Sequence, residues 1–338
     1  MRKSHFCVVI PAFNEEKVIE GSINVLRKVI TLKHIYVVSD GSTDKTVEIA
    51  NKTSVNVLAL PQNVGKARAI FELISAWRLT DRYKYILFSD ADSHLGKDFL
   101  THVMKLMERK PACIVGNVTS DKKGFISAYR TYEYGLSHLI FKNAQNVMQV
   151  ITVAPGCASL YRSDVLKRLD FSNHTLTEDF DLTLQIHQKK LGKIVFAPKA
   201  VVITQDPITI KDYWHQIVRW YSGLWQNIFL HKLYLPTKKI NIEILLLMLD
   251  FFLFLASFYY LFLHSELIYK LVATMYLSML FFALSIIILQ RKFWAIIYSP
   301  LFFLLYLINI VAYIFSFFRV VFSSKKRLSW RKVARYGA

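Results

Sequence analysis

Residues 175–220 read TLTEDFDLTLQIHQKKLGKIVFAPKAVVITQDPITIKDYWHQIVRW and carry two short polar signals, one near each end. The first signal is Thr177-Glu178-Asp179, which places two carboxylates next to each other in the sequence. An acidic pair of this kind can supply a general base. The first signal therefore indicates a site where a proton is removed from a substrate.

The second signal is the run from Gln216 to Trp220. Its Gln can donate a hydrogen bond, Arg219 is a fixed cation that suits a phosphate, and Trp220 offers a flat face to a sugar or a base. Residues 193–204, between the two signals, have the composition of a strand. We expect this strand to fold the second signal back over the first.

The chain upstream alternates strand-like and helix-like segments. Short β-branched runs predict buried strands, and amphipathic stretches between them predict helices. The expected strands are residues 6–10, 35–38, 55–60, 85–89 and 112–118, and the expected helices include 18–30, one from Thr46, 66–76, 129–145 and 181–190. This rhythm predicts a doubly wound α/β sheet, in which ligands bind at the carboxyl ends of the strands.

Polar side chains follow several of these strands. They are Asn14, Glu15, Asp40, Lys66, Asp90 and Asp92. A lysine at the start of a helix is mildly unfavourable, so Lys66 hints at an anionic partner, although a surface lysine is an equally simple interpretation. Asp40 has the alternative of a turn-forming residue.

Asp90 and Asp92 stand one residue apart at the end of a predicted strand. Two such carboxylates can face one Mg²⁺ or Mn²⁺ ion, which prefers carboxylate and phosphate oxygens. The ion would then stabilise a leaving diphosphate. A solvated turn remains the alternative, because Asp-x-Asp alone is a weak signal.

Charge and cysteine content narrow the class of protein. The net charge is +19, but the basic runs flank apolar segments, which is typical of the cytoplasmic side of a membrane protein. No basic patch studded with aromatic residues is present, so we expect no nucleic acid partner. Cys7, Cys113 and Cys157 are too widely spaced for a zinc site or a disulfide framework and fit a reducing compartment. Residues 6–10 are too short for a signal peptide, so we expect the catalytic part to stay inside the cell.

Three apolar segments follow residue 240. They are residues 244–263, 267–289 and 293–318, and each is long enough to cross a bilayer core. The tail is rich in Lys and Arg and should remain cytoplasmic, which three crossings would not allow. Because Pro300 interrupts the last segment, we expect two full crossings and one interfacial or re-entrant element. The predicted parts are a cytoplasmic domain at 1–235, membrane and interfacial helices at 236–320 and a basic tail at 321–338.

Taken together, these motifs resemble glycosyltransferase family 2, above all its membrane-integrated branch of cellulose, chitin, hyaluronan and poly-N-acetylglucosamine synthases. The likeness extends over about residues 5–235. Six motifs carry it in order: residues 11–15, 40–44, 63–66, 90–92, 177–179 and 216–220. One departure is Phe13, where the family often has Tyr; stacking stays possible, but one hydrogen bond is lost.

The resemblance implies a GT-A fold, an inverting reaction and a role for each motif. Nucleotide binding would fall to Phe13, Glu15, Asp40 and Lys66, and diphosphate binding through the metal to Asp90 and Asp92. Asp179 would be the general base, helped by Glu178, whose like charge raises its pKa. The remaining motif, Gln216, Arg219 and Trp220, would cover the donor diphosphate and form the floor of the acceptor subsite.

The sequence therefore predicts a multi-pass enzyme of the cell membrane with a cytoplasmic catalytic domain. It would use Mg²⁺ or Mn²⁺ to transfer a sugar, first of all N-acetylglucosamine, from a UDP-sugar to a growing β-linked polysaccharide. The enzymatic alternative is a single transfer to a membrane lipid, which gives a glycolipid. A non-enzymatic alternative is an assembly subunit with an inactive transferase domain. No membrane segment is expected before the catalytic domain, which leaves room for a partner membrane subunit.

Overall fold

The computed structural model describes residues 4–120 and 123–323, apart from several side chains of the helix Lys239–Leu263. The described chain forms two compact units that alternate along the sequence. The first unit comprises residues 4–120 and 141–205, and the second comprises residues 123–140 and 206–323. Each unit is considered by itself below.

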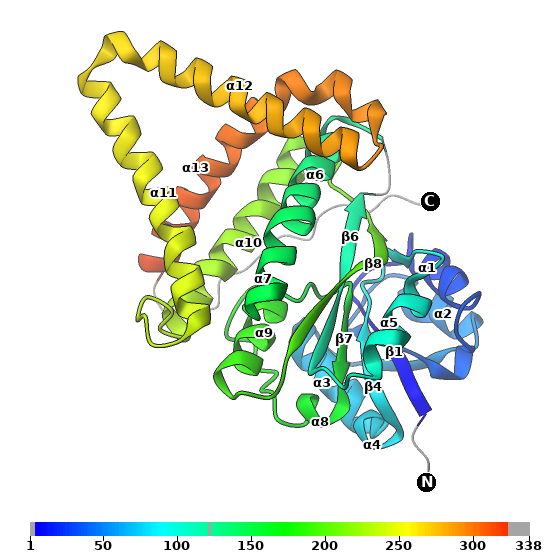
Figure 1. Ribbon diagram of the computed structural model, residues 1–338. Helices are drawn as coiled ribbons and strands as arrows, with labels where there is room; N and C mark the ends of the chain where they lie inside the picture. Colours follow the sequence, from blue (N-terminus) through cyan, green and yellow to red (C-terminus); the bar gives the residue numbers. More distant parts are fainter. Residues whose placement is uncertain (1–3, 121–122, 324–338) are drawn as a thin grey trace. The chain divides into compact units, whose positions relative to one another are not determined.

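The described part of the first unit is built on an eight-stranded sheet in the order β3-β2-β1-β4-β7-β6-β8-β5 (Figure 1). Its strands are β1 Ser4–Ala12, β2 Ile35–Asp40, β3 Asn56–Leu60, β4 Tyr83–Phe88, β5 Ser93–Leu95, β6 Cys113–Ser120, β7 Ser159–Arg162 and β8 Ile194–Thr204. Strands β3, β2, β1 and β4 pair in parallel, as the alternation of strands and helices predicts. Because β7 runs antiparallel to both β4 and β6, the sheet as a whole is mixed.

Helices of the first unit cover this sheet. They are α1 Ile19–Leu26, α2 Thr46–Lys52, α3 Lys66–Ala76, α4 Leu79–Arg82, α5 Phe99–Met107, α7 Asn143–Met148, α8 Ser163–Leu166 and α9 Glu178–Gln188, with a short 3₁₀ turn η1 at Leu32–His34. Helix α3 lies on β1 and β2, and α5 lies on β6 and β8. The observed α1 is shorter than the predicted helix over residues 18–30, because the chain turns after Leu26.

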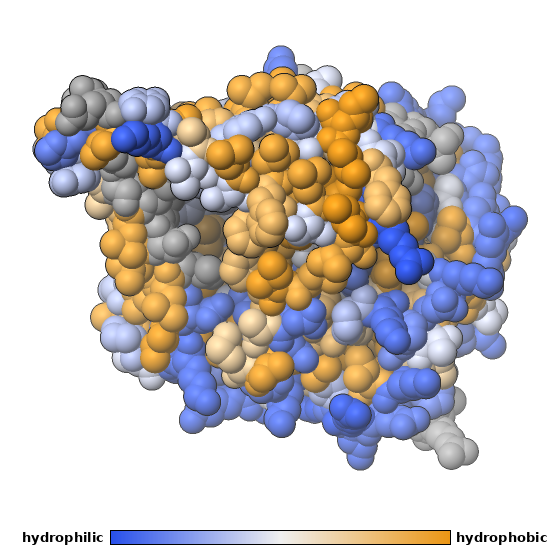
Figure 2. Space-filling view, turned by 45° about the horizontal axis from the view of Figure 1, so that its top comes forward, coloured by the Kyte–Doolittle hydropathy of each residue, from blue (hydrophilic) through white to orange (hydrophobic). Residues whose placement is uncertain are grey.

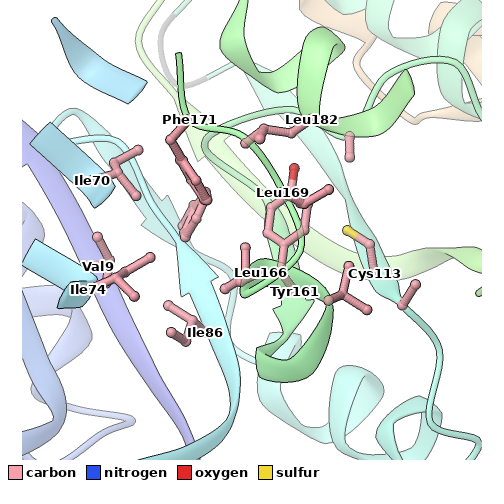
Figure 3. Packing of buried hydrophobic residues seen from close by; sticks show 14 of the residues in the cluster. Val9, Ile70, Ile74, Ile86, Cys113, Tyr161, Leu166, Leu169, Phe171 and Leu182 are labelled. Carbon is pink, nitrogen blue, oxygen red and sulfur yellow. The ribbon is translucent and has the colours of Figure 1, made fainter. Parts of the chain in front are cut away.

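The apolar contact between α3 and the sheet is one part of the core of the first unit (Figure 3). Ile70 and Ile74 of α3 face Val9 of β1 and Ile86 of β4, and all four are almost fully buried. Removing such side chains from water contributes about 1.5–3 kcal/mol each. This contact fixes the first turn of α3, and therefore Lys66, relative to the ends of the central strands.

The second unit is helical. It contains α6 Phe125–Gly135, α10 Ile210–Leu230, α11 Lys239–Leu263, α12 Ser265–Leu289, the 3₁₀ segment η3 Phe293–Leu301 and α13 Phe302–Val321. Helices α10 and α13 run side by side. Helix α6 approaches α12 at Gly135, where an added Cβ would collide with Gln290 and Ile286. The single helix predicted over residues 129–145 is wrong, because a π-helical segment, η2 Leu136–Lys142, separates α6 from α7.

Two helical spans in the described residues are long and apolar enough to cross a membrane, Leu267–Leu289 and Phe293–Val321. Both coincide with predicted segments, and Pro300 lies inside η3, before α13 begins. The predicted segment 244–263 falls within α11, of which only part of the side chains is described. Figure 2 shows apolar side chains gathered over one face of the molecule, and exposed apolar residues of α12, η3 and α13 include Leu277, Phe281, Ile297 and Phe315. The predicted basic tail lies outside the described residues.

Candidate active site

The loops after β1 and β2 are tied to each other, which places their polar residues together. Asn14, at a positive φ of 54°, donates its backbone N–H to the Ser42 hydroxyl at 3.0 Å and accepts from the Thr43 N–H at 2.8 Å. The N–H of Glu15 donates to the Thr46 hydroxyl at 2.7 Å, and its side chain is buried. Phe13 is half-buried just before this pair.

Asp40 holds the loop that leads to α3. Its two carboxylate oxygens accept the backbone N–H groups of Val64 at 2.7 Å and Gly65 at 3.0 Å. Burial raises the pKa of Asp40, and these two hydrogen bonds offset part of the rise. Gly41 follows at a φ of +69°, where an added Cβ would lie 2.5 Å from the backbone of residues 62 and 63. The observed contacts of Asp40 thus position Lys66; the predicted contact with a nucleotide stays a prediction.

Lys66 joins two of the predicted motifs. Its ammonium group lies 2.8 Å from Asp90 and 2.9 Å from Glu178. Burial lowers the pKa of Lys66, but the two carboxylates outweigh this effect and the net shift is upward, so Lys66 stays charged. Gly156 allows this approach, because an added Cβ would lie 2.9 Å from the Lys66 nitrogen.

Asp179 lies in the first turn of α9, next to this ion-pair network. One oxygen accepts the Gly156 N–H at 3.2 Å, and the other accepts the Phe180 N–H at 2.8 Å. Burial and the charge of Glu178 raise the pKa of Asp179 to about 6, against the opposing effect of Lys66. A carboxylate in this range is free to accept a proton at neutral pH, which a general base must do.

The two acids considered for a metal differ in their surroundings. Asp92 is buried and accepts a hydrogen bond from Ser93 at 3.3 Å, whereas Asp90 is half-buried and paired with Lys66. Residues 4–120 and 123–323 contain no group of three or more His, Cys, Asp or Glu side chains that could hold an ion. Two carboxylates still fit Mg²⁺ or Mn²⁺, since such ions commonly bind one or two carboxylates together with substrate phosphates.

Gln216, Arg219 and Trp220 lie on α10, in the second unit. Within that unit, Gln216 and Trp220 share a partner, the buried Arg130 of α6. The structure therefore brings Lys66, Asp90, Glu178 and Asp179 together in one unit and two of the α10 residues together in the other. The expected folding of the second signal over the first stays a prediction.

Several residues at these places were not predicted from the sequence. Lys142 is buried, donates to the Val153 carbonyl at 2.8 Å, and has its pKa lowered to about 8 by burial, with Asp179 acting in the opposite direction. Gly156 gives room to Lys66, and its only signal in the sequence is the run of small residues at 154–158. Arg130 carried no signal, because nothing local links it to Gln216, 86 positions away.

Known proteins resemble this chain over the same region. The model of the family described as glycosyl transferase family 2 matches residues 7–170. A poly-beta-1,6-N-acetyl-D-glucosamine synthase of Staphylococcus epidermidis is 26% identical over 249 residues, which cover 70% of this chain and 59% of that protein. A protein of the same name from Staphylococcus aureus is 25% identical over 224 residues, which cover 64% and 53%. The chain therefore spans less than two thirds of the length of these relatives.

Among solved structures, the fold resembles that of a mannosyltransferase from Pyrobaculum calidifontis, determined with GDP-Man and Mn²⁺. The TM-score is 0.58 at 16% identity, with 95% of this chain and 88% of the other covered. At this identity the likeness concerns the fold alone, which is the α/β GT-A fold. The matched sequence model, the relatives and the fold of the mixed sheet all indicate a glycosyltransferase domain. Residues 7–170 of the chain carry a glycosyl transferase family 2 domain.

Proposed function

We propose that the chain is a membrane-bound, metal-dependent, inverting glycosyltransferase that extends a β-linked polysaccharide from a UDP-sugar donor. The observation that carries this proposal is Asp179, a carboxylate with a pKa of about 6 beside the Lys66, Asp90 and Glu178 network. An inverting transfer needs one base and an activated leaving group, and no second catalytic carboxylate. This arrangement offers both requirements within one unit.

In the proposed reaction, Asp179 accepts the proton of the acceptor hydroxyl. The acceptor oxygen forms a bond to the anomeric carbon of the donor, and the bond from that carbon to the nucleoside diphosphate breaks. A single displacement of this kind inverts the configuration at the anomeric carbon. Burial, together with the charge of Glu178, keeps the pKa of Asp179 high enough for proton transfer, and Gly156 holds the carboxylate in place through its N–H.

Asp90 and Asp92 would hold the divalent ion, which neutralises the charge of the leaving diphosphate when bound. Lys66 lies 2.8 Å from Asp90 and adds a second positive charge to this part of the site. Phe13, Glu15 and Asp40 are proposed to form the nucleotide pocket, and Gln216, Arg219 and Trp220 the cover of the donor and the floor of the acceptor subsite. The solved mannosyltransferase with Mn²⁺ and GDP-Man supports a divalent ion, without distinguishing Mg²⁺ from Mn²⁺.

A polysaccharide product is supported by the names of the Staphylococcus relatives, which also make N-acetylglucosamine the first sugar to test. The two long apolar helices support association with a membrane. We place the catalytic domain on the cytoplasmic side of a multi-pass protein, where UDP-sugars are made. A lipid-linked or polysaccharide acceptor and a partner membrane subunit complete the proposal.

The proposal is tested with the full chain purified in lipid nanodiscs and incubated with a panel of radiolabelled nucleotide sugars. We expect incorporation from UDP-N-acetylglucosamine and, at low enzyme and excess donor, long products while most acceptor remains unextended. Mass spectrometry that finds only a lipid with one added sugar would instead support the glycolipid synthase. An absence of transfer from every donor, with UDP still bound, would contradict an enzymatic role.

A further inference from the structure

A buried arginine organises the helical unit around the motif on α10. Arg130 of α6 is only 2% exposed. Its Nη2 donates to the side-chain oxygen of Gln216 at 2.5 Å, and its Nη1 forms an ion pair with Glu133 at 2.7 Å. Because Arg130 keeps its charge while buried, these contacts must hold it in one orientation.

The same guanidinium lies between two aromatic rings of α10. Its central carbon is 4.4 Å from the centre of the Trp220 ring and 4.7 Å from that of Tyr213. Such stacked contacts are stronger when they are shielded from water. Arg130 thus contacts two of the three residues of the motif. Because its guanidinium is planar, it can donate a hydrogen bond to Gln216 from its edge and stack on the Trp220 ring with its face.

Glu133 connects this arrangement to a third helix. Its second oxygen accepts from the Asn309 amide of α13 at 2.9 Å, and the same amide donates to the Tyr129 hydroxyl at 3.0 Å. Tyr221, next to Trp220, donates to the Asn309 oxygen at 3.4 Å. Polar side chains of an apolar helix commonly face protein partners, and here they fix α13 against α6 and α10.

We propose that Arg130 is a positioning residue for the donor and acceptor contacts of Gln216 and Trp220. By occupying the amide oxygen of Gln216, it presents the amide NH₂ group as a hydrogen-bond donor to substrate. By covering one face of the Trp220 ring, it leaves the opposite face to a sugar. This inference rests on the proposed function, because it assigns Gln216 and Trp220 to the substrate site.

The test compares Arg130→Lys with Arg68→Lys in the full chain in nanodiscs. Arg68 is a matched control, since it pairs with Glu72 at 2.6 Å and lies 4.9 Å above the Phe71 ring, but on the exposed surface of α3. Lysine keeps a cation beside Glu133 and loses the planar stack. A role confined to neutralising Glu133 would therefore be rescued by Lys, whereas a positioning role would not.

We expect Arg130→Lys to lower kcat about 10²-fold, the effect typical of a misplaced substrate contact. A second readout is ¹⁹F NMR of protein labelled with 5-fluorotryptophan, in which Trp220→Phe identifies the Trp220 signal. This signal should shift or broaden in Arg130→Lys and stay unchanged in Arg68→Lys. Wild-type turnover and an unaltered Trp220 signal in Arg130→Lys would overturn the inference.

Gln216→Glu decides the question if Arg130→Lys does not fold. Its carboxylate can still accept from Arg130, so the Trp220 signal should persist, but the amide donor is lost and transfer should fall by a similar factor. Wild-type turnover in this variant would overturn the inference. If the unmodified protein transfers no sugar, the proposed function fails, and the NMR comparison still decides whether Arg130 orders Trp220.

Discussion

Asp179 combines the two properties that the proposed chemistry needs from one side chain. Backbone N–H groups of Gly156 and Phe180 fix its position, and burial together with Glu178 raises its pKa to about 6. Lys66 acts in the opposite direction and limits the rise. The result is a carboxylate that is ionised at neutral pH and still basic enough to accept a proton.

Asp179→Asn should abolish transfer while UDP still binds. An amide has nearly the same shape but cannot accept the proton, and loss of a general base typically lowers a rate about 10²–10⁴-fold. Turnover with labelled donor and titration with UDP measure the two quantities. Asp164→Asn, at an exposed carboxylate paired with Arg162, is the control and should leave both unchanged. Near-normal turnover of Asp179→Asn would refute the assignment.

The pH dependence of transfer should report the same group. Because Asp179 must be ionised to act as a base, kcat/KM should fall as the pH drops below about 6. A rate independent of pH between 5 and 7 would contradict this account.

The stability that Asp179 contributes to the fold should change with pH in the opposite direction. The pKa of Asp179 in the folded chain lies above its ordinary 3.8, so the stability that its proton contributes is complete below pH 3.8 and is lost as the pH rises through about 6.

At the scale of elements, the loops after β1 and β2 form one connected structure. Gly41 occupies a backbone conformation that side chains rarely adopt, with the backbone of residue 63 directly beside it. Gly41→Ala should lower the free energy of unfolding by about 1–3 kcal/mol. It should also weaken UDP binding, because it displaces the loop that leads to Lys66.

Gly21→Ala is the matched control for this change. Gly21 lies in α1 with open space around it, and Ala favours a helix over Gly by about 0.5–1 kcal/mol. Chemical denaturation and calorimetry with UDP measure both variants. If Gly41→Ala is as stable as Gly21→Ala, the loop is more adaptable than its contacts indicate.

Local patterns predicted the parallel half of the sheet well. Helix α3 was expected at residues 66–76 and begins and ends there, because Gly65 starts it and its apolar face meets the core. The antiparallel strand β7 was missed, since its four residues leave too little pattern to recognise. The π-helical segment at 136–142 was missed as well, because π-helical hydrogen bonding has no simple sequence period.

The candidate site also contains residues that the sequence predicted and residues that it did not. Lys66 and Asp90 follow strand ends, so the sequence predicted that they lie at the same edge of the sheet, whereas the contact of Lys66 with Glu178 was not predicted. Arg130 and Glu133 form a local pair on α6, but Glu133 meets Asn309 only through the packing of α6 against α13, over a separation of 176 positions. No local pattern records such a contact, and hydrophobic periodicity alone describes α6 as an ordinary amphipathic helix.

For the whole molecule, metal and nucleotide binding should be coupled. UDP affinity should be higher with Mn²⁺ or Mg²⁺ than with a chelator, because the ion joins the diphosphate to Asp90 and Asp92. Asp92→Ala should remove this difference, while Asp98→Ala, at an exposed carboxylate nearby in sequence, should keep it. Equal UDP affinity with and without the ion, measured by calorimetry on the wild type, would show that the two acids form only a structural turn.

The central claim for this chain, a GT-A domain followed by apolar helices, is that it transfers the sugar by a single displacement assisted by one base. The configuration of the bond that the enzyme makes tests this claim most directly. Product formed from an α-linked UDP-sugar by the full chain in nanodiscs would be examined by ¹H NMR at the new anomeric position. The account predicts a β linkage, which means inversion. An α linkage would mean retention of configuration and would contradict the role given to Asp179.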